Sequence, residues 1–228
     1  MIPLLEMRWR DGVFAHWPVD PETVSRTLPE GLSIATHDGR AWLGVVGFEM
    51  TGIRPRGVPR TLGRSFPELN LRTYVDRGDE RGVYFYNLDA DDRLSVGLAR
   101  RLFRLPYYRA RMSLDPGVET RLRSRRVHPG VPPARFDGRY RLRSDPEEAA
   151  RGSRAAFFVE NYRFFTSDDR GRLWRGTIAH PPWAVAPAEL TVRRNDLFEA
   201  SGFDSPGGEP VVHGFRSIDV RAGPIRRV

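Results

Sequence analysis

Four polar residues at alternate positions form the group in this sequence best suited to chemistry. In the stretch FPELNLRTYV (66–75), every second residue is polar: Glu68, Asn70, Arg72 and Tyr74. On a strand such residues share one face, with about 6.6 Å between successive members. If that face is exposed, it is the ordinary polar side of an antiparallel strand; if it lines a pocket, it could bind a small acid or carbonyl compound. On the pocket reading, Glu68 is the candidate base with a raised pKa, Arg72 binds an anion, and Asn70 and Tyr74 contact the ligand.

A second group of candidates follows in the stretch LPYYRARM and near the motif HPPW. A tyrosine at position 107 or 108 could donate a hydrogen bond to a carbonyl oxygen, so Tyr107 and Tyr108 are both candidate catalytic residues. Alternation places Arg111 on the same face as Tyr107, and we assign it to ligand binding. His180 precedes Pro-Pro-Trp and is a candidate acid or base; the alternative is a histidine hydrogen-bonded at the end of a strand.

Composition removes several kinds of chemistry. All 37 basic residues are arginine, so no side chain of the chain can form a Schiff base. There is no cysteine, which excludes disulfides and thiolate catalysis. The five histidines share no ligand spacing, and the glycine-rich and zinc-binding motifs are missing, so we predict neither a metal nor a cofactor.

The net charge of +8 raises the question of a nucleic-acid partner. Arginine without lysine is also what GC-rich codon usage produces, and the densest basic run, 121–126, has no interleaved aromatic residues. We interpret that run as a solvated edge strand, which disfavours nucleic-acid binding. The longest apolar run, 41–48, is too short to span a bilayer, and MIPLLEMRWRD does not resemble a secretory signal. The sequence therefore predicts a cytoplasmic protein.

Short alternating segments separated by turn residues dominate the chain and predict about ten strands with three or four short helices. A helix is expected over 93–104, with Leu94, Leu98 and Leu102 on one apolar stripe. Another is expected to open at Asp145. The segment 157–166 is expected to be a strand, and a helical start to it stays open. No repeat or linker divides the chain, so residues 1–228 are predicted to form a single α+β domain, mainly β, built on a curved antiparallel barrel.

Several segments together resemble a known family. FPELNLRTYV, GVYFYNLDA, LPYYRARM after an Ala-Arg pair, and HPPW followed by Ala-Glu are similar to the YqjF-like family, domain of unknown function 2071. The resemblance covers nearly the whole chain. One departure is Asn161, which stands where the family shows arginine between glutamate and tyrosine.

The YqjF-like family in turn resembles, more remotely, the acetoacetate decarboxylase superfamily. This resemblance implies a barrel with a polar pocket, in which Glu68 matches an acidic residue of the decarboxylases and Tyr107 or Tyr108 stands where they keep a Schiff-base lysine. It leaves a homo-oligomer open, since the decarboxylases assemble into larger oligomers. We expect a small-molecule-binding barrel whose ligand is anionic or carries a carbonyl; a non-covalent enzyme and a non-catalytic binding protein both remain open.

Overall fold

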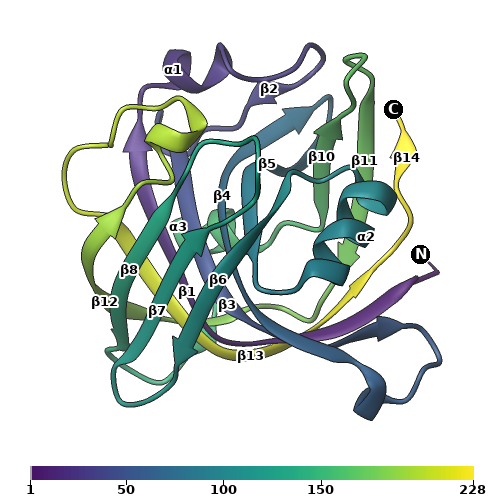
Figure 1. Ribbon diagram of the computed structural model, residues 1–228. Helices are drawn as coiled ribbons and strands as arrows, with labels where there is room; N and C mark the ends of the chain where they lie inside the picture. Colours follow the sequence, from purple (N-terminus) through teal and green to yellow (C-terminus); the bar gives the residue numbers. More distant parts are fainter. Residues whose placement is uncertain (1) are drawn as a thin grey trace.

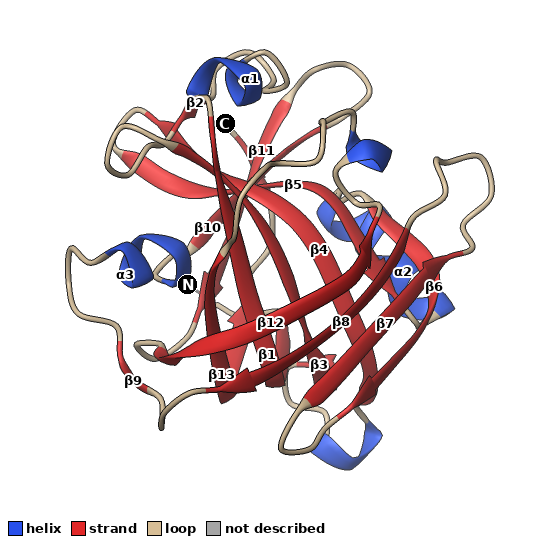
Figure 2. Ribbon diagram, turned by 90° about the vertical axis from the view of Figure 1, so that its left-hand side faces the viewer, coloured by secondary structure: helices blue, strands red, loops and turns tan. Residues whose placement is uncertain are grey.

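The computed structural model describes residues 2–228 and consists mainly of β-strands, which confirms the predicted fold class (Figure 1). The α-helices are α1 (Pro21–Ser25), α2 (Arg93–Phe103) and α3 (Arg154–Val159), and the two 3-10 helices are Arg60–Leu62 and Glu199–Ser201. The strands are β1 (Leu5–Val19), β2 (Ser33–Ile34), β3 (Ala41–Pro55), β4 (Arg64–Arg77), β5 (Glu80–Ala90), β6 (Tyr107–Asp115), β7 (Thr120–Arg126), β8 (Arg135–Leu142), β9 (Glu147–Glu148), β10 (Arg163–Ser167), β11 (Leu173–Ala179), β12 (Ala184–Asn195), β13 (Val211–Ala222) and β14 (Arg226–Arg227). The helices lie at the periphery of the strands (Figure 2).

The strand pairings close into a ring. β4 pairs with β5, β5 with β10, β10 with β11, β11 with β13, β13 with β1, β1 with β3, and β3 again with β4. We call these strands the cavity barrel. All these pairs are antiparallel except β5–β10, which is parallel. Closure satisfies the backbone groups that an open sheet would leave at its edges.

A second set of strands lies on the other side of β1, β3 and β4. β6, β7, β8 and β12 pair in that order and connect back to the cavity barrel through β5 and β13; we call them the side sheet (Figure 1). The strands between the two parts are therefore buried on both faces. On β1, Phe14 packs in the core of the cavity barrel, whereas Val13 and Ala15 pack in the core shared with the side sheet.

The apolar stripe predicted on α2 was assigned to the wrong face. Leu94, Leu98 and Leu102 are 56%, 48% and 55% exposed, whereas Val96 and Phe103 are buried. The buried face is the one that closes the barrel, and a helix needs only a narrow apolar face to do so. The helix ends at Arg104, which adopts φ 53° and leads into Leu105 and Pro106.

One other local prediction was wrong. The helix expected to open at Asp145 does not form, because Glu147 and Glu148 pair with β12 as β9. The next helix is α3, where Ser153 caps it by accepting a hydrogen bond from the Ala156 amide. The segment 157–166 starts within α3, as the sequence left open, and becomes strand in β10.

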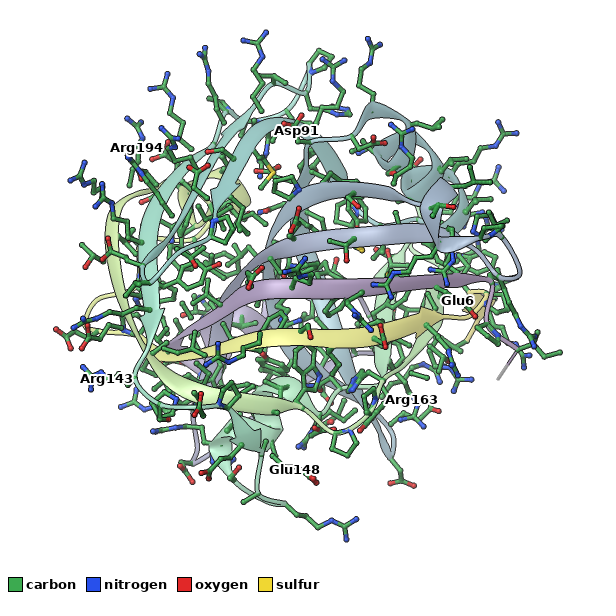
Figure 3. All side chains as sticks on the ribbon, turned by 90° about the horizontal axis from the view of Figure 1, so that it is seen from below. Glu6, Asp91, Arg143, Glu148, Arg163 and Arg194 are labelled. Carbon is green, nitrogen blue, oxygen red and sulfur yellow. The ribbon has the colours of Figure 1, made fainter. Side chains whose placement is uncertain are left out.

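The arginine-rich run is an internal strand rather than the predicted edge strand. β7 pairs with β6 on one side and β8 on the other. Arg121 and Arg123 form ion pairs with Asp137 and Asp115, and a third arginine of the run, described below, is buried. Acidic residues of the neighbouring strands thus offset much of its charge. Other charged side chains, such as Arg143, Glu148 and Arg194, lie at the outer surface (Figure 3).

No helix within residues 2–228 combines the length and the apolar character needed to cross a lipid bilayer.

Candidate functional site

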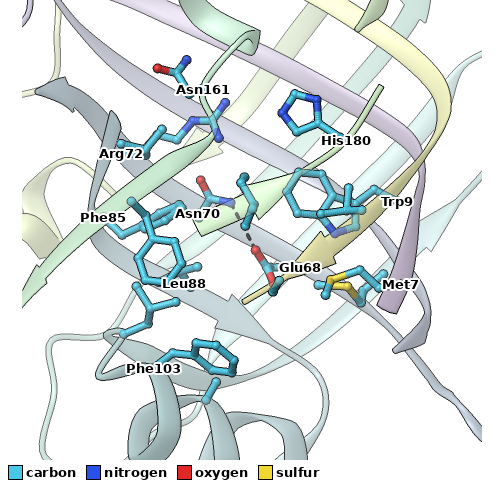
Figure 4. A pocket seen from close by; sticks show the side chains of 18 of the residues that line it. Met7, Trp9, Glu68, Asn70, Arg72, Phe85, Leu88, Phe103, Asn161 and His180 are labelled. Carbon is cyan, nitrogen blue, oxygen red and sulfur yellow. Dashed lines mark hydrogen bonds between the residues drawn. The ribbon is translucent and has the colours of Figure 1, made fainter. Parts of the chain in front are cut away.

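A cavity of about 120 Å³ lies inside the cavity barrel, beneath α2. Most of its wall is apolar and includes Met7 and Trp9 from β1, Phe85 and Leu88 from β5, and Phe103 from α2 (Figure 4). A mainly apolar cavity with a few polar groups is typical of small-molecule sites.

β4 supplies a row of polar groups to this cavity. Glu68, Asn70 and Arg72 line it and are only 3%, 2% and 6% exposed. Their neighbours Leu69 and Leu71 point the other way, into the core shared with the side sheet. The polar face therefore points into the barrel, and the solvent-exposed alternative is excluded.

Glu68 forms a buried pair with Tyr107. The phenol of Tyr107 donates to Oε2 of Glu68 at 2.6 Å, and Nδ2 of Asn70 lies 3.3 Å from Oε1. Pro106 ends the turn after α2, and Tyr107 then enters β6 directly opposite Leu88 of β5 in a parallel pairing. Tyr107 therefore approaches Glu68 from a strand that β4 does not pair with.

The protonation of this pair is controlled by burial. Burial raises the pKa of Glu68 from 4.5 to about 7, against the opposing effects of the Tyr107 and Asn70 hydrogen bonds and the positive charge of Arg72. Burial, together with the neighbouring Glu68 carboxylate, raises the pKa of Tyr107 well above 10. At neutral pH the site thus holds a carboxyl that can gain or lose a proton and a phenol that stays protonated.

Arg72 brings a buried positive charge to the same cavity. Its guanidinium carbon lies 5.2 Å from the ring centre of Phe14 and 5.8 Å from that of Tyr74. Its Nε has no hydrogen-bond partner among the described residues. Aromatic rings stabilise a cation without neutralising it, so Arg72 remains available to an anionic group.

Tyr74 lies behind the cavity wall rather than in it. Its hydroxyl is 2.6 Å from Nε2 of His16 and donates to the carbonyl oxygen of Phe158 at 3.0 Å. His16 stacks on the ring of Phe158, and burial, with the charges of Arg72 and His213, keeps its pKa well below 6.5. Tyr74 therefore supports Arg72 and α3. The prediction that it contacts the ligand is wrong, because its side chain does not line the cavity. The sequence contained no signal for its pairing with His16, because β1 and β4 meet only through β3, where Gly44 lies between His16 and Arg72.

His180, Asn161 and Arg163 also belong to the polar part of the lining. Nδ1 of His180 lies 2.8 Å from the carbonyl oxygen of Pro181, and its ring stacks on Tyr162 at 4.4 Å. The structure thus brings His180 to the cavity, as the sequence suggested. Asn161 was noted only as a departure from the family pattern; it follows α3 and is 5% exposed.

Tyr108 and Arg111 lie outside the cavity, which corrects their assignment. Because neighbouring residues of a strand face opposite sides, Tyr107 turns toward Glu68 and Tyr108 turns away, against the ring of His128 and the buried Arg126. Arg111 has the orientation of Tyr107 but is exposed, since β6 runs beside β5 only over 107–109 and then joins the side sheet.

Within residues 2–228, no three histidine or acidic side chains are grouped so that they could hold a metal ion.

The closed arrangement of strands around a mainly apolar cavity is the acetoacetate decarboxylase-like fold. The enzyme MppR of enduracididine biosynthesis, solved with pyruvate, superposes with a TM-score of 0.69 at 13% identity, over 100% of this chain and 91% of that chain. Acetoacetate decarboxylase from Legionella pneumophila superposes with a TM-score of 0.68 at 13% identity, over 99% of this chain and 87% of that chain. At such identities the likeness shows the fold alone.

The family is shown by sequence. The family model of DUF2071, described as an uncharacterised conserved protein, matches residues 6–219. The uncharacterised protein YqjF of Bacillus subtilis (strain 168) is 37% identical over 226 residues, which cover 98% of this chain and 92% of that protein. The chain therefore belongs to the DUF2071 family.

Proposed function

We propose that this protein binds a small acid with a carbonyl group in the cavity and that Glu68 exchanges a proton with it. The observation that carries the proposal is the pairing of a carboxyl of pKa about 7 with a buried phenol at 2.6 Å, inside an enclosed cavity. Arg72 would bind the acid group of the ligand. The complex of the fold relative MppR with pyruvate supports a ligand of this size and class.

The reaction that fits this geometry is proton abstraction next to a carbonyl. The Glu68 carboxylate would take a proton from the carbon beside the carbonyl, and the electron pair of that C–H bond would move onto the carbonyl oxygen to give an enolate. The Tyr107 hydroxyl would then turn from Glu68 to the enolate oxygen and stabilise it by a hydrogen bond. Return of the proton from Glu68 restores the carboxylate. No imine is involved, in keeping with the lack of lysine.

The first test measures binding. Isothermal titration with pyruvate should give a saturable signal for the wild-type protein and lose it in Arg72→Met, which removes the charge but keeps much of the side-chain length. The matched control is Arg143→Met, because Arg143 lies at the outer surface with 64% of its side chain accessible. Equal titration curves for all three proteins would contradict the role of Arg72. Circular dichroism and the unfolding midpoint show whether Arg72→Met remains folded.

The second test separates an enzyme from a binding protein. Proton NMR in D₂O follows the loss of the methyl signal of pyruvate, which exchange catalysed by Glu68 accelerates. The expected result is fast exchange for the wild type and none above background for Glu68→Gln, with pyruvate binding retained in both. Binding without exchange in the wild type would leave the non-catalytic binding protein as the function.

A further inference from the structure

One end of the cavity combines the positive charge of Arg72 with hydrogen-bond acceptors whose identity is fixed by their surroundings. Figure 4 shows Arg72, Asn161 and His180 at this end, with Phe103 and Leu88 at the other. We call this end of the cavity the acceptor end, after the acceptor atoms of Asn161 and His180. All three side chains line one cavity, so a ligand bound at Arg72 would lie in a space that Asn161 and His180 also border.

The side chain of Asn161 has only one possible orientation. Its Nδ2 lies 3.0 Å from the carbonyl oxygen of Phe157 and 3.2 Å from that of Phe158. Carbonyl oxygens only accept, so this atom must be the NH₂ group, and the remaining amide atom, Oδ1, can only accept. Oδ1 is buried and has no hydrogen-bond partner in the part of the chain that the structure describes. Exchange of the two amide atoms would set Oδ1 against two carbonyl oxygens.

The same argument fixes the tautomer of His180. Nδ1 lies 2.8 Å from the carbonyl oxygen of Pro181, so in the neutral ring Nδ1 carries the hydrogen and Nε2 is the acceptor. Within the described residues 2–228, Nε2 is buried and also has no hydrogen-bond partner. Two residues with a fixed acceptor, one after α3 and one after β11, thus line the cavity that Arg72 also lines.

Asn70 does not share this constraint. Its Oδ1 is also without a partner, but its Nδ2 contacts Glu68, a group that can accept as a carboxylate or donate as a carboxylic acid. The amide of Asn70 can therefore turn to suit either form of Glu68. It belongs to the proton-transfer pair and adds no fixed requirement on the ligand.

We propose that the molecule recognised by this cavity carries an O–H or N–H donor beside its acid group, so that hydroxy acids are bound in preference to the same acids without the hydroxyl. This rests on the proposed function for the anion site at Arg72 and extends it to the substrate class. A carboxylate alone satisfies the donors of Arg72 but leaves the acceptors of Asn161 and His180 buried against a group with no hydrogen to offer. A hydroxyl supplies that hydrogen, and sites built to bond a hydroxyl discriminate strongly against analogues without one.

The test compares matched acids on the wild-type protein. Isothermal titration measures the dissociation constants of pyruvate, 3-hydroxypyruvate and 3-fluoropyruvate, and of propionate and lactate. Fluorine is close to a hydroxyl in size but cannot donate, so the fluoro acid isolates the hydrogen bond from the volume. We expect at least one hydroxy acid to bind about tenfold more tightly than its unsubstituted partner, with the fluoro acid behaving like pyruvate.

Two variants assign the preference to the acceptor end. Asn161→Leu and His180→Phe each remove one acceptor, and at least one of them should reduce the preference for the hydroxyl, because the affinity for the hydroxy acid falls more than the affinity for pyruvate. If Asn161→Leu does not fold because the contacts of Nδ2 with α3 are lost, His180→Phe and the wild-type ligand series still decide the matter.

The outcomes distinguish the two proposals. If pyruvate and propionate bind but the hydroxy acids bind no better in either series, the inference about the donor is wrong and the anion site stands. If none of the five acids binds, the proposed function is wrong and the inference falls with it. A hydroxyl preference that survives in both variants would also overturn the assignment to Asn161 and His180.

Discussion

The raised pKa of Glu68 makes the stability of this protein depend on pH in a direction that can be tested without knowing the ligand. The pKa is about 7 in the folded chain, against 4.5 for an ordinary glutamate. As pH rises from 4.5 to 7, the carboxyl ionises in the unfolded chain but stays protonated in the folded one. The stabilising contribution is therefore complete below about pH 4.5 and is lost as pH rises through 7. At about 1.4 kcal/mol per pH unit, the loss amounts to about 3 kcal/mol.

Replacing Glu68 by glutamine removes this dependence. The glutamine side chain is neutral at every pH and can accept from Tyr107, while the amide of Asn70, whose Oδ1 has no partner, can turn to accept from the new NH₂ group. Relative to the wild type, Glu68→Gln should therefore gain about 2 to 3 kcal/mol of unfolding free energy between pH 5 and pH 8.

The assay is urea unfolding followed by tryptophan fluorescence at several pH values, with the wild-type curve subtracted from that of the variant. Subtraction cancels the titration of groups that the substitution does not affect. The control is Glu189→Gln, because the ion pair with Arg141 lowers the pKa of that exposed carboxyl, so that it is ionised throughout this range. A difference between Glu68→Gln and the wild type that stays flat, or that falls with pH, would refute the assignment of a raised pKa to Glu68.

Three further outcomes follow from the same contacts. In Tyr107→Phe the pKa of Glu68 should rise further, since the phenol hydrogen bond lowers it, and the pH at which stability is lost should move up in the same unfolding assay; an unchanged midpoint would contradict the pairing. Leu98→Ala should change the unfolding free energy by less than about 0.5 kcal/mol, whereas Phe103→Ala should lower it by about 3 kcal/mol; the reverse order would return the leucine stripe of α2 to the core. Gly44→Ala should lower the unfolding free energy by about 1 to 3 kcal/mol, because the new methyl group would lie 2.8 Å from the imidazole of His16. An unchanged unfolding free energy would mean that His16 moves aside at little cost.

The alternation of β4 was predictable from sequence, but the inward direction of its polar face was not. A strand with one polar and one apolar face normally turns the polar face to water. Here Leu69 and Leu71 pack in the core shared with the side sheet, so Glu68 and Arg72 on the opposite face point into the cavity. Whether a strand separates two cores depends on the pairing of strands far apart in sequence, and no local pattern records it.

Contacts between segments far apart in sequence also decide which face of α2 is buried and which tyrosine of β6 meets Glu68. The 3.6-residue period correctly found a leucine stripe, but the face that seals the cavity consists of Val96, Ala99 and Phe103, which are less conspicuous in the sequence. Alternation correctly separated Tyr107 from Tyr108 without indicating which one meets Glu68. That choice is made by the parallel pairing with β5, a contact across the whole of α2.

The tyrosine at position 107 affects the pKa of Glu68, in addition to being unable to form an imine. The resemblance to the decarboxylases implies a lysine at the counterpart of Tyr107 or Tyr108, and an ammonium group beside Glu68 would favour the carboxylate and lower its pKa. The phenol donates a hydrogen bond at 2.6 Å but carries no charge, so burial prevails and the pKa of Glu68 stays at about 7. A phenol in place of an ammonium group thus cannot form an imine and, by the same electrostatics, leaves Glu68 with a pKa of about 7. The proposed reaction needs no covalent intermediate, and this is why we assign its proton transfer to Glu68 rather than to Tyr107.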